Sequence, residues 1–382
     1  MAFFLSDHMR IAINARLLIP GKLDGIGWFT WETCTRIFRD HPEVQFHLLF
    51  DRKPPEEFRT FSNVICHYTL PPARRPWLFH LWLEYTIPWM LKRIKADLFV
   101  SPDGLGTLAG TCPQLAVIHD INFVRHPGDL PAAYSSYYNT LTARLVHHAS
   151  RLGTVSAFSR DEIVREYGIS AESIDIIPNA ASDRFKPVSE EQANRVRERW
   201  TAGAPYFVFV GSIHPRKNIP RLLLAFDAFI QKHGTNHRLL IAGATFWMYE
   251  HIQDALKSMQ HADRVVFTGR LSGEKLPEIV ASSEGMAFMS YYEGFGIPVL
   301  EAFRSGVPVL TSRGTAMEEV AAGAALLADP YSIDEITEGL ASLAFDQERR
   351  TQLVAKGHQR QEAFSWDQSA DLLWQSIMRA MR

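Results

Sequence analysis

Two glutamates eight positions apart, Glu293 and Glu301, enclose the segment of this chain whose residues are best suited to chemistry. Gly294 and Gly296 let the backbone turn tightly after an apolar run, and Pro298 suits the first position of a helix. A helix that begins there directs backbone N–H groups at an anion. Glu293 then lies on the sugar side of the anion, and Glu301 can accept hydrogen bonds from a vicinal diol such as a ribose. The segment therefore predicts a site that holds a nucleotide sugar at both ends.

The alternative for this segment is an ordinary strand-to-helix turn with two solvated glutamates. Nine ordered positions favour the functional interpretation, whereas a lone Gly-x-Gly would not. The predicted donor-binding positions in this segment are Gly294, Phe295, Gly296, Val299 and Glu301.

A basic pair, Arg216 and Lys217, follows an apolar run at 206–210 and a turn that opens at Gly211. Two cations at the carboxyl end of a strand, opposite the Glu293 turn, would neutralise a diphosphate as it departs. The alternative is a solvated basic pair that ends a loop, and the residues alone do not decide between the two. Both side chains are expected at a cleft and not in a core, so that substituting either should leave folding unaffected.

Gly25 and Gly27 follow the first predicted strand and precede a helical pattern at 28–39. Glycines at a helix start let the backbone close on a phosphate. Phe29 and Thr30 occupy the next positions, so the spacing is not that of a dinucleotide-binding loop. An ordinary turn is an equal alternative.

His119 and Asp120 end another apolar run. A histidine at the tip of a strand in an α/β sheet is placed for contact with a ligand, although a structural histidine is the commoner case. Asp120 is predicted either to bind an acceptor or to orient the loop.

Short apolar runs alternate with longer helical patterns, which is the signature of βαβ units and parallel sheets. The predicted fold is α/β, with two doubly wound, Rossmann-like domains that face each other across a cleft at the carboxyl ends of their sheets. The predicted domains are residues 1–187 and 188–365, followed by a final helix at 366–382. A capping box at Ser159 and Glu162 is expected to open one helix. The predicted strands are Arg10–Arg16, Val44–Phe50, Asn63–Tyr68, Asp97–Val100, Leu115–His119, Leu152–Ser156, Ser173–Ile177, Tyr206–Val210, Arg238–Ala242, Arg264–Thr268, Met286–Met289, Val307–Leu310 and Ala325–Leu327.

The Glu293 segment resembles the signature of the retaining glycosyltransferases of family 4, which have the GT-B fold. The likeness extends along the chain from Met9, through an ordered series of marks: Gly25 and Gly27, His119 and Asp120, Phe185 to Pro187, Gly211 with Arg216 and Lys217, Gly269, and Glu293 to Glu301. These marks are specific for the family and not for a substrate.

The resemblance implies roles that the residues alone do not give. The final helix would cross back to the first domain, the Gly25 loop would face the diphosphate and the transferred sugar, and His119 would touch the donor sugar. The segment of Gly269, Arg270 and Leu271 would frame the base, although an ordinary strand-to-loop turn is nearly as good an interpretation.

The chain departs from the family pattern at Ser212, at Asn218 and in the linker segment 179–182, and the departure in the linker does not imply a loss of activity. Ser212 stands where the family usually has an arginine directly after the glycine, so Arg216 is expected to take over the role of that arginine. Asn218 stands where many relatives have glycine.

The expected activity is transfer of a sugar from a nucleoside-diphosphate sugar to a glycan or lipid-linked acceptor, with retention by front-face attack. Relatives in polysaccharide assembly suggest mannose from a guanosine donor. No Asp-x-Asp occurs in the sequence, so no cofactor or metal is expected, and Arg216, Lys217 and amides near Gly296–Leu300 would stabilise the leaving group. The alternatives are a catalytically silent nucleotide-sugar-binding partner and another GT-B enzyme, such as a phosphorylase or a nucleotide-sugar epimerase.

Composition limits the partners and the compartment. A net charge of −2 over 382 residues argues against a general nucleic-acid binder, and three scattered cysteines fit a reducing cytoplasm. No signal peptide or membrane-spanning run is found. Met9 is the expected biological start, with residues 1–8 a disordered extension.

Residues 74–95 are rich in aromatic side chains and have basic residues at both ends. They predict either a core helix with a basic end or an interfacial helix in peripheral contact with the cytoplasmic membrane face. Pro88 is expected to break or kink this helix.

Overall fold

The computed structural model describes residues 9–19, 21, 23–244, 249–271, 273 and 275–382. The extension predicted for residues 1–8 lies outside them. The chain divides into two compact units, one formed by the described residues up to Asn179 together with Trp366–Arg382, and the other by Ala180–Ser365. The first unit thus ends at Asn179, eight residues before the domain boundary that the sequence predicts after residue 187. The predicted boundary stays a prediction.

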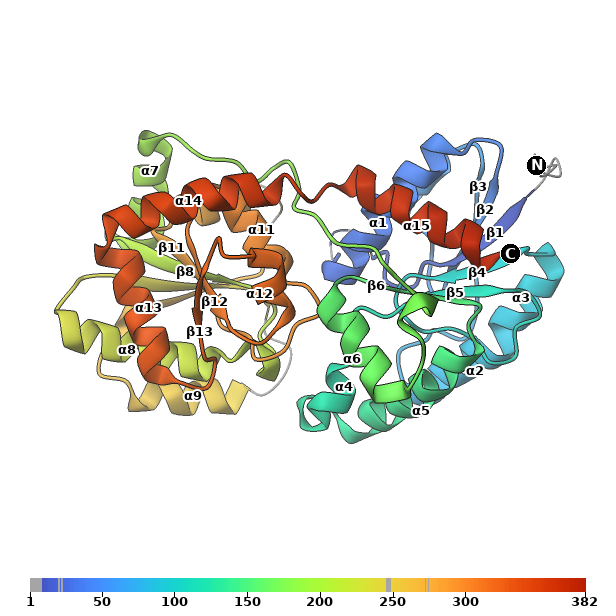
Figure 1. The fold of residues 1–382 in the computed structure, drawn as a ribbon, viewed down its shortest axis with the longest axis horizontal. Coiled ribbons are helices and arrows are strands. Elements are labelled where there is room, and N and C mark those ends of the chain that lie inside the picture. The colour runs from blue at the N-terminus through green and yellow to red at the C-terminus, as the bar shows by residue number, and fades with distance from the viewer. Residues whose placement is uncertain (1–8, 20, 22, 245–248, 272, 274) are drawn as a thin grey trace. The chain divides into compact units, whose positions relative to one another are not determined.

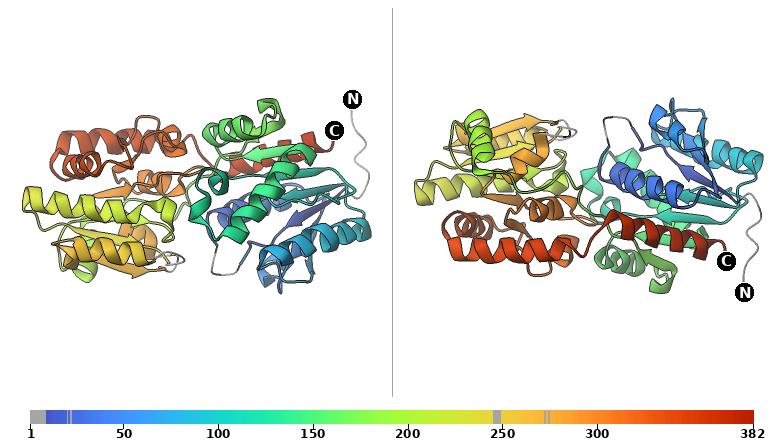
Figure 2. Two further views of the ribbon diagram at one scale, coloured as in Figure 1. Left: turned by 90° about the horizontal axis from the view of Figure 1, so that it is seen from below. Right: turned by 90° about the horizontal axis from the view of Figure 1, so that it is seen from above.

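The first unit is built on a parallel sheet of seven strands in the order β3-β2-β1-β4-β5-β6-β7 (Figure 1). Its strands are β1 (Arg10–Asn14), β2 (Gln45–Phe50), β3 (Val64–Tyr68), β4 (Leu98–Ser101), β5 (Gln114–Val117), β6 (Arg151–Thr154) and β7 (Ile174–Ile176). Its helices are α1 (Gly25–Asp40), η1 (Glu56–Thr60), α2 (Pro76–Leu81), η2 (Trp82–Thr86), α3 (Ile87–Ile94), α4 (Asn122–Arg125), η3 (Pro127–Asp129), α5 (Ala132–His148), α6 (Ala157–Tyr167), η4 (Ala171–Ser173) and α15 (Trp366–Ala380). Helices cover both faces of the sheet (Figure 2).

The second unit is built on a parallel sheet of six strands in the order β10-β9-β8-β11-β12-β13. Its strands are β8 (Tyr206–Val210), β9 (Arg238–Ala242), β10 (Val265–Gly269), β11 (Gly285–Phe288), β12 (Val309–Ser312) and β13 (Leu326–Ala328). Its helices are α7 (Glu190–Thr201), η5 (Pro215–Lys217), α8 (Ile219–His233), α9 (Tyr249–Ser258), η6 (Ala262–Arg264), α10 (Lys275–Ala281), α11 (Ile297–Arg304), α12 (Ala316–Ala321), α13 (Ile333–Phe345) and α14 (Gln347–Gln361).

The predicted α/β class and all thirteen predicted strand segments are confirmed, with ends that differ by up to two residues. Apolar runs identify these strands because helices cover both faces of each sheet and bury side chains on both sides. In each sheet the strand order reverses at one point, between β1 and β4 in the first unit and between β8 and β11 in the second. Ligands of doubly wound folds bind at the carboxyl ends of the strands that flank such a reversal.

The capping box predicted at Ser159 is wrong. Helix α6 begins at Ala157, and the hydroxyl of its N-cap, Ser156, accepts a hydrogen bond from the Ser159 N–H at 3.0 Å. A serine three residues earlier, Ser156, is thus the N-cap of this helix.

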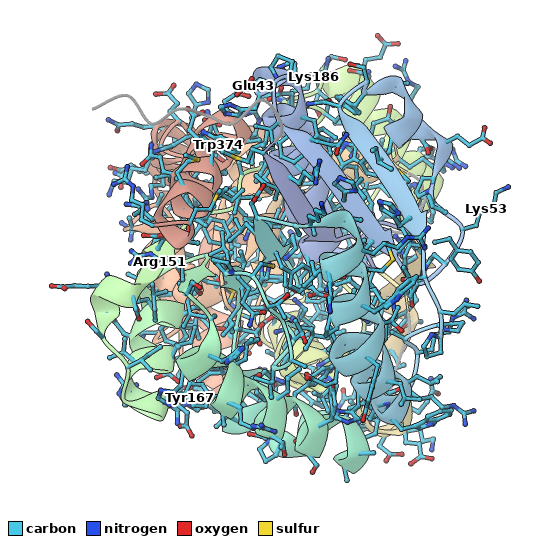
Figure 3. The ribbon with its side chains drawn as sticks, turned by 90° about the vertical axis from the view of Figure 1, so that its right-hand side faces the viewer. Glu43, Lys53, Arg151, Tyr167, Lys186 and Trp374 are labelled. Atoms are coloured by element: carbon cyan, nitrogen blue, oxygen red, sulfur yellow. The ribbon has the colours of Figure 1, made fainter. Side chains whose placement is uncertain are left out.

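Helix α15, at the end of the chain, packs against α1 and against strands of the first unit (Figure 1). Its Trp374 stacks on the His41 ring at 3.7 Å, and its Ser376 hydroxyl donates to Asp175 at 2.7 Å. The same carboxylate binds the Arg151 guanidinium at 2.6 and 2.9 Å; Arg151 and Trp374 are labelled in Figure 3. These contacts join the end of the chain to the first sheet.

Candidate functional site

The predicted site residues fall in both units, and in the second unit a charged cluster lies where the strand order reverses. Lys217 ends the short helix η5 after β8, and Glu293 lies in the loop after the neighbouring strand β11. The Lys217 ammonium donates a hydrogen bond to Oε1 of Glu293, and the Arg216 guanidinium lies 3.8 Å from Oε2. Two segments 76 residues apart therefore meet through one carboxylate and two cations.

Glu293 is ionised in this environment. Glu293 is only 6% exposed, and burial alone would raise the pKa of its carboxyl. The charges of Arg216 and Lys217 outweigh burial, so that the pKa lies below its ordinary value.

Lys217 is 8% exposed and its ammonium also lies 4.9 Å from the centre of the Phe288 ring. The expectation that this side chain lies outside a core is wrong, because the lysine is half of a buried ion pair. Removing it would leave the Glu293 carboxylate without its hydrogen-bonding cation, and breaking a buried pair in this way is strongly destabilising.

The backbone around the basic pair is held by hydrogen bonds. Asn218 has a left-handed conformation with φ of 57°, which asparagine tolerates and glycine adopts readily. Its side-chain amide donates to the carbonyls of Met289 and Pro330 at 3.1 and 2.6 Å. The Tyr291 N–H donates to the Arg216 carbonyl at 2.9 Å. Asparagine at this position therefore keeps the turn and also ties it to the loops after β11 and β13.

Gly211 and Gly243 make the closest backbone approach of this region. A Cβ on Gly243 would lie 1.7 Å from the Gly211 carbonyl oxygen, so only glycine fits there. Gly211 itself has φ of 152°, and its N–H donates to the Ala242 carbonyl at 2.9 Å. The sequence analysis missed Gly243, although a glycine directly after the apolar run of β9 is a signal for such an approach.

The N-terminus of α11 follows Glu293. Gly296 is its N-cap with φ of 99°, and a Cβ there would lie 2.7 Å from Cγ of Met317. Phe295 packs edge-on against Phe364 at 5.6 Å, and Val299 is fully buried. The side chains of Phe295 and Val299 therefore belong to the core, so that these two predicted positions can meet a ligand only through their backbone.

Glu301 lies one helical turn further along α11 and is partly buried. Burial raises the pKa of this carboxyl to about 7, although the charge of Arg184 opposes the rise. Arg184 also donates to the Gly273 carbonyl at 3.2 Å, in the segment that follows β10. Gly269, with φ of 67°, ends β10, and Arg270 and Leu271 continue from it.

In the first unit, His119 lies two residues beyond the end of β5 and is partly buried. Its Nε2–H donates to the Pro102 carbonyl at 2.8 Å, and its ring packs edge-on against Phe29 at 4.9 Å. Burial lowers the pKa of His119, so the imidazole is neutral near pH 7 and its Nδ1 is an acceptor. The Asp120 carboxylate accepts a hydrogen bond from the Asn122 N–H at 3.0 Å, which orders the loop after β5.

Helix α1 begins at Gly25, and its N-cap is an acid. The Asp24 carboxylate accepts a hydrogen bond from the Gly27 N–H at 2.9 Å. A Cβ on Gly27 would lie 3.1 Å from the Leu17 carbonyl oxygen, so this glycine serves a close packing of helix and loop.

The sequence analysis also missed a buried polar network at the ends of β1 and β4. Asp103 binds the Arg16 guanidinium at 2.9 and 3.2 Å and accepts from the Asn14 amide at 2.9 Å. Arg16 and Asp103 follow the two strands that flank the reversal in this sheet, and Asp103 also acts electrostatically on His119. A signal was available, because polar residues interrupt otherwise apolar runs at both places.

Within the described ranges, with gaps at 20, 22, 245–248, 272 and 274, no group of three or more His, Cys, Asp or Glu residues is arranged to hold a metal ion. In the same part of the chain, no helix combines the length and apolar character needed to cross a membrane.

Two parallel, doubly wound sheets with a charged cluster at the strand reversal define the GT-B class of glycosyltransferase fold. Residues 23–185 match the family model described as Glycosyltransferase Family 4, and residues 190–360 match the model described as Glycosyl transferases group 1. The chain therefore belongs to the family 4 glycosyltransferases.

Some known proteins of similar sequence carry mannosyltransferase names, and others, such as one from Rhodococcus opacus that is 27% identical over 311 residues (79% of this chain, 66% of that protein), are named D-inositol 3-phosphate glycosyltransferase. O-antigen chain mannosyltransferase B of Escherichia coli is 29% identical over 361 residues, which cover 91% of this chain and 94% of that protein. The MMP alpha-(1->4)-mannosyltransferase of Mycolicibacterium hassiacum is 28% identical over 232 residues, 59% of this chain and 53% of that protein.

Solved structures share the fold at low identity. Anabaena Alr3699/HepE, crystallised with UDP and glucose, has a TM-score of 0.76 at 14% identity, covering 97% of this chain and all of that one. WaaG, a glycosyltransferase involved in lipopolysaccharide biosynthesis, has a TM-score of 0.74 at 15% identity, covering 96% of this chain and 99% of that one.

Proposed function

We propose that this glycosyltransferase transfers mannose, with retention, from a nucleoside-diphosphate sugar to a glycan or lipid-linked acceptor in polysaccharide synthesis. The observation that carries the donor proposal is the buried pair of Lys217 and Glu293, with the partly exposed Arg216 beside it, near the N-terminus of α11. Two cations and a row of helix N-terminal amides suit a diphosphate, which gains charge as the glycosidic bond breaks. The names of the mannosyltransferase relatives support the choice of sugar.

The donor would lie along the second unit. Lys217 and Arg216 hold the diphosphate together with the amides of Gly294, Gly296 and the first turn of α11. Glu293 keeps the Lys217 ammonium in place and faces the sugar. Because the two cations share one carboxylate, the cluster has a net positive charge with which to receive an anion.

The other end of the donor would lie between Glu301 and the end of β10. Glu301 accepts hydrogen bonds from the ribose diol, and the backbone of Gly269, Arg270 and Leu271 frames the base. Arg184 supports this arrangement, because it is bonded to the Gly273 carbonyl and acts on the Glu301 charge.

The first unit would act on the sugar and the acceptor. The neutral imidazole of His119 can accept a hydrogen bond from a sugar hydroxyl at Nδ1, since its Nε2–H is bonded to Pro102. Asp120 would orient the loop or bind the acceptor, and Gly25 and Gly27 would bring the start of α1 close to the sugar. The proposal involves no metal, because Lys217 and Arg216 supply the positive charge.

Nucleotide release tests the proposal. The purified protein is incubated with GDP-mannose, GDP-glucose, UDP-glucose or UDP-galactose, each with and without short mannosides as acceptors. We expect nucleoside diphosphate release that depends on an acceptor and is fastest with GDP-mannose. Tight donor binding without any release would instead favour a silent binding partner, and release without a glycosidic product would favour hydrolysis or another reaction class.

A further inference from the structure

One side of the first unit exposes an unusual number of large apolar side chains. Among the described residues, ten large hydrophobic side chains are exposed, by 37 to 66%, and seven of them lie between Ile65 and Trp89. Large exposed apolar surfaces on a globular protein mark an interaction site more often than a solvated face.

Four of these side chains form one stripe on the helical segment that runs through α2, η2 and α3. The exposed residues are Trp77, Leu81, Tyr85 and Trp89, at 60, 38, 66 and 57% exposure. The opposite side of the segment is firmly packed, with Phe79, Trp82, Leu83, Ile87, Met90 and Leu91 in the core beside β1, β2 and β4. Figure 3 shows this segment (cyan) along one side of the unit, next to the blue strands. The segment is therefore a core helix on one face and an open aromatic face on the other, which combines both interpretations of the sequence.

The π-helical turn η2 keeps the four side chains in one stripe. In a regular α-helix, residues four apart drift around the axis by about 40° at each step. The wider π turn winds less per residue and offsets part of this drift between Leu81 and Tyr85. The turn also places Pro88 at the start of α3, where its missing N–H is tolerated, so the expected break appears as this local widening.

The stripe continues onto the loop after the edge strand β3. Tyr68 and Leu70 are 58 and 59% exposed. The Thr86 hydroxyl donates to the Leu70 carbonyl at 2.7 Å, and the Trp82 indole N–H donates to Thr69 at 2.8 Å, so this loop is fixed beside the helix. We call the six residues Tyr68, Leu70, Trp77, Leu81, Tyr85 and Trp89 the aromatic face.

The charges around the aromatic face are almost all positive. Between positions 61 and 96 the chain has five basic residues and a single acid, although its overall net charge is −2. The basic residues are exposed at both ends of the helical segment: Arg74, Arg75, Lys92, Arg93 and Lys95. The one acid, Glu84, turns inward and accepts hydrogen bonds from the Leu108 N–H at 3.0 and 3.2 Å. The surface that a partner meets is thus apolar in the middle and cationic at its ends.

We propose that the aromatic face docks on the surface of a membrane that contains anionic lipid. Tryptophan and tyrosine favour the boundary between head groups and acyl chains, where one end of the ring is apolar and the other is wet. Arginine and lysine beside them attract anionic head groups. A protein partner or a second copy would have to match the positive charge as well as the aromatic stripe. The inference extends the proposed function, since it brings the enzyme to the place of a lipid-linked acceptor.

Binding to vesicles tests this inference without any acceptor. The full chain is sedimented with vesicles of phosphatidylcholine alone or with one third phosphatidylglycerol, at low and high salt. We expect binding to the mixed vesicles that weakens at high salt. Exchange of Trp77 and Trp89 for alanine should weaken it at least tenfold, with an unchanged melting temperature, since both side chains are exposed.

Charge reversal with a matched control separates a docking face from general attraction. The Lys92→Glu, Arg93→Glu variant should lose at least tenfold in affinity for the mixed vesicles. The Arg349→Glu, Lys356→Glu variant changes the net charge equally at two exposed positions of α14 and should stay within twofold of the parent. Equal losses in the two variants, or equal binding to both kinds of vesicle, would overturn the inference.

Two further outcomes are informative. A dimer that dissociates on exchange of Trp77 and Trp89, without vesicle binding by the parent, would identify a second copy as the occupant and overturn the inference. Nucleotide release measured on the same preparations keeps the two proposals apart. Turnover without vesicle binding contradicts only the membrane inference, whereas vesicle binding without turnover supports it and counts against the proposed function.

Discussion

Two helices of this protein, α1 and α11, begin in glycine-rich turns at the carboxyl ends of their sheets, yet their first turns differ in electrostatic character. Helix α1 is capped by the Asp24 carboxylate, which already accepts a hydrogen bond from the Gly27 N–H. Helix α11 is capped by Gly296, which has no side chain, and it begins close to the cluster of Lys217, Arg216 and Glu293. A glycine pattern shows that a backbone can approach a ligand, but the N-cap residue and the nearby charges determine whether binding of an anion is favourable.

We infer that the leaving diphosphate lies at α11 and that α1 contacts uncharged parts of the substrates. A phosphate at α1 would have to approach the Asp24 carboxylate, whereas at α11 it meets two cations. The substitutions below test this division, from the largest expected effect to the smallest.

Lys217→Ala should have the largest effect on turnover. Charge on the diphosphate grows as the glycosidic bond breaks, so we expect kcat to fall by about 10²–10³, as for loss of one preorganised donor to an oxyanion. Steady-state kinetics at saturating donor measure this. A folded variant with the parent's kcat would remove Lys217 from the leaving-group site and return attention to the start of α1.

Glu301→Ala should act mainly on donor binding, because a ribose is held alike in the ground and transition states. Loss of hydrogen bonds to a charged group costs about 1.5–3 kcal/mol, which corresponds to a roughly ten- to hundredfold rise in the donor KM. The donor KM and kcat are measured together. An unchanged KM would exclude Glu301 from the ribose site.

The donor KM should also depend on pH through Glu301. Burial raises the pKa of this carboxyl to about 7, so that below this pH it is protonated and accepts the diol poorly. Affinity should therefore rise with pH, by up to about tenfold per unit below the pKa, and level off above it. The profile should be flat in Glu301→Gln. The stability of the protein without donor should show the opposite trend. It should fall as the pH rises from 4.5, the ordinary pKa of a glutamate, to about 7, because folding then requires a buried carboxylate to be ionised.

Asp24→Asn should have the smallest effect. Asparagine preserves the cap of α1 but removes its charge, so we expect little change in stability and less than a twofold change in the donor KM. A marked improvement in KM would indicate that a phosphate does lie at the start of α1, which is the reverse of the present comparison.

The fold was predictable to a large extent because buried parallel strands appear as apolar runs between helical patterns. Tyr206–Val210 and Arg238–Ala242 agree with the prediction at both ends. Glycines, cations and carboxylates at predicted strand ends also identified candidate site residues in the sequence. The pairing of Lys217 with Glu293 could not be predicted, because these residues are 76 positions apart and meet only when β8 and β11 become neighbours.

Burial explains the remaining differences. Nothing in the local sequence indicates that Lys217 is enclosed. Asp24, in contrast, is a preferred type of N-cap residue and Val299 is apolar, so the cap of α1 and the burial of Val299 could have been predicted. The pairing of Arg16 with Asp103 was missed because the two residues are 87 positions apart and meet only when β1 and β4 become neighbours, although polar residues at both places were a signal.

The most direct test of the account combines stability and turnover in Lys217→Met, Glu293→Gln and the double variant. Each single variant breaks a buried ion pair and should lose up to about 3–5 kcal/mol in the free energy of unfolding, with Arg216 reducing the loss in Lys217→Met. The double variant is neutral at both positions, so we expect it to regain much of that stability while its kcat stays at the level of Lys217→Met. Recovery of kcat together with stability would contradict the account, because the pair would then serve only the fold and not the departing diphosphate.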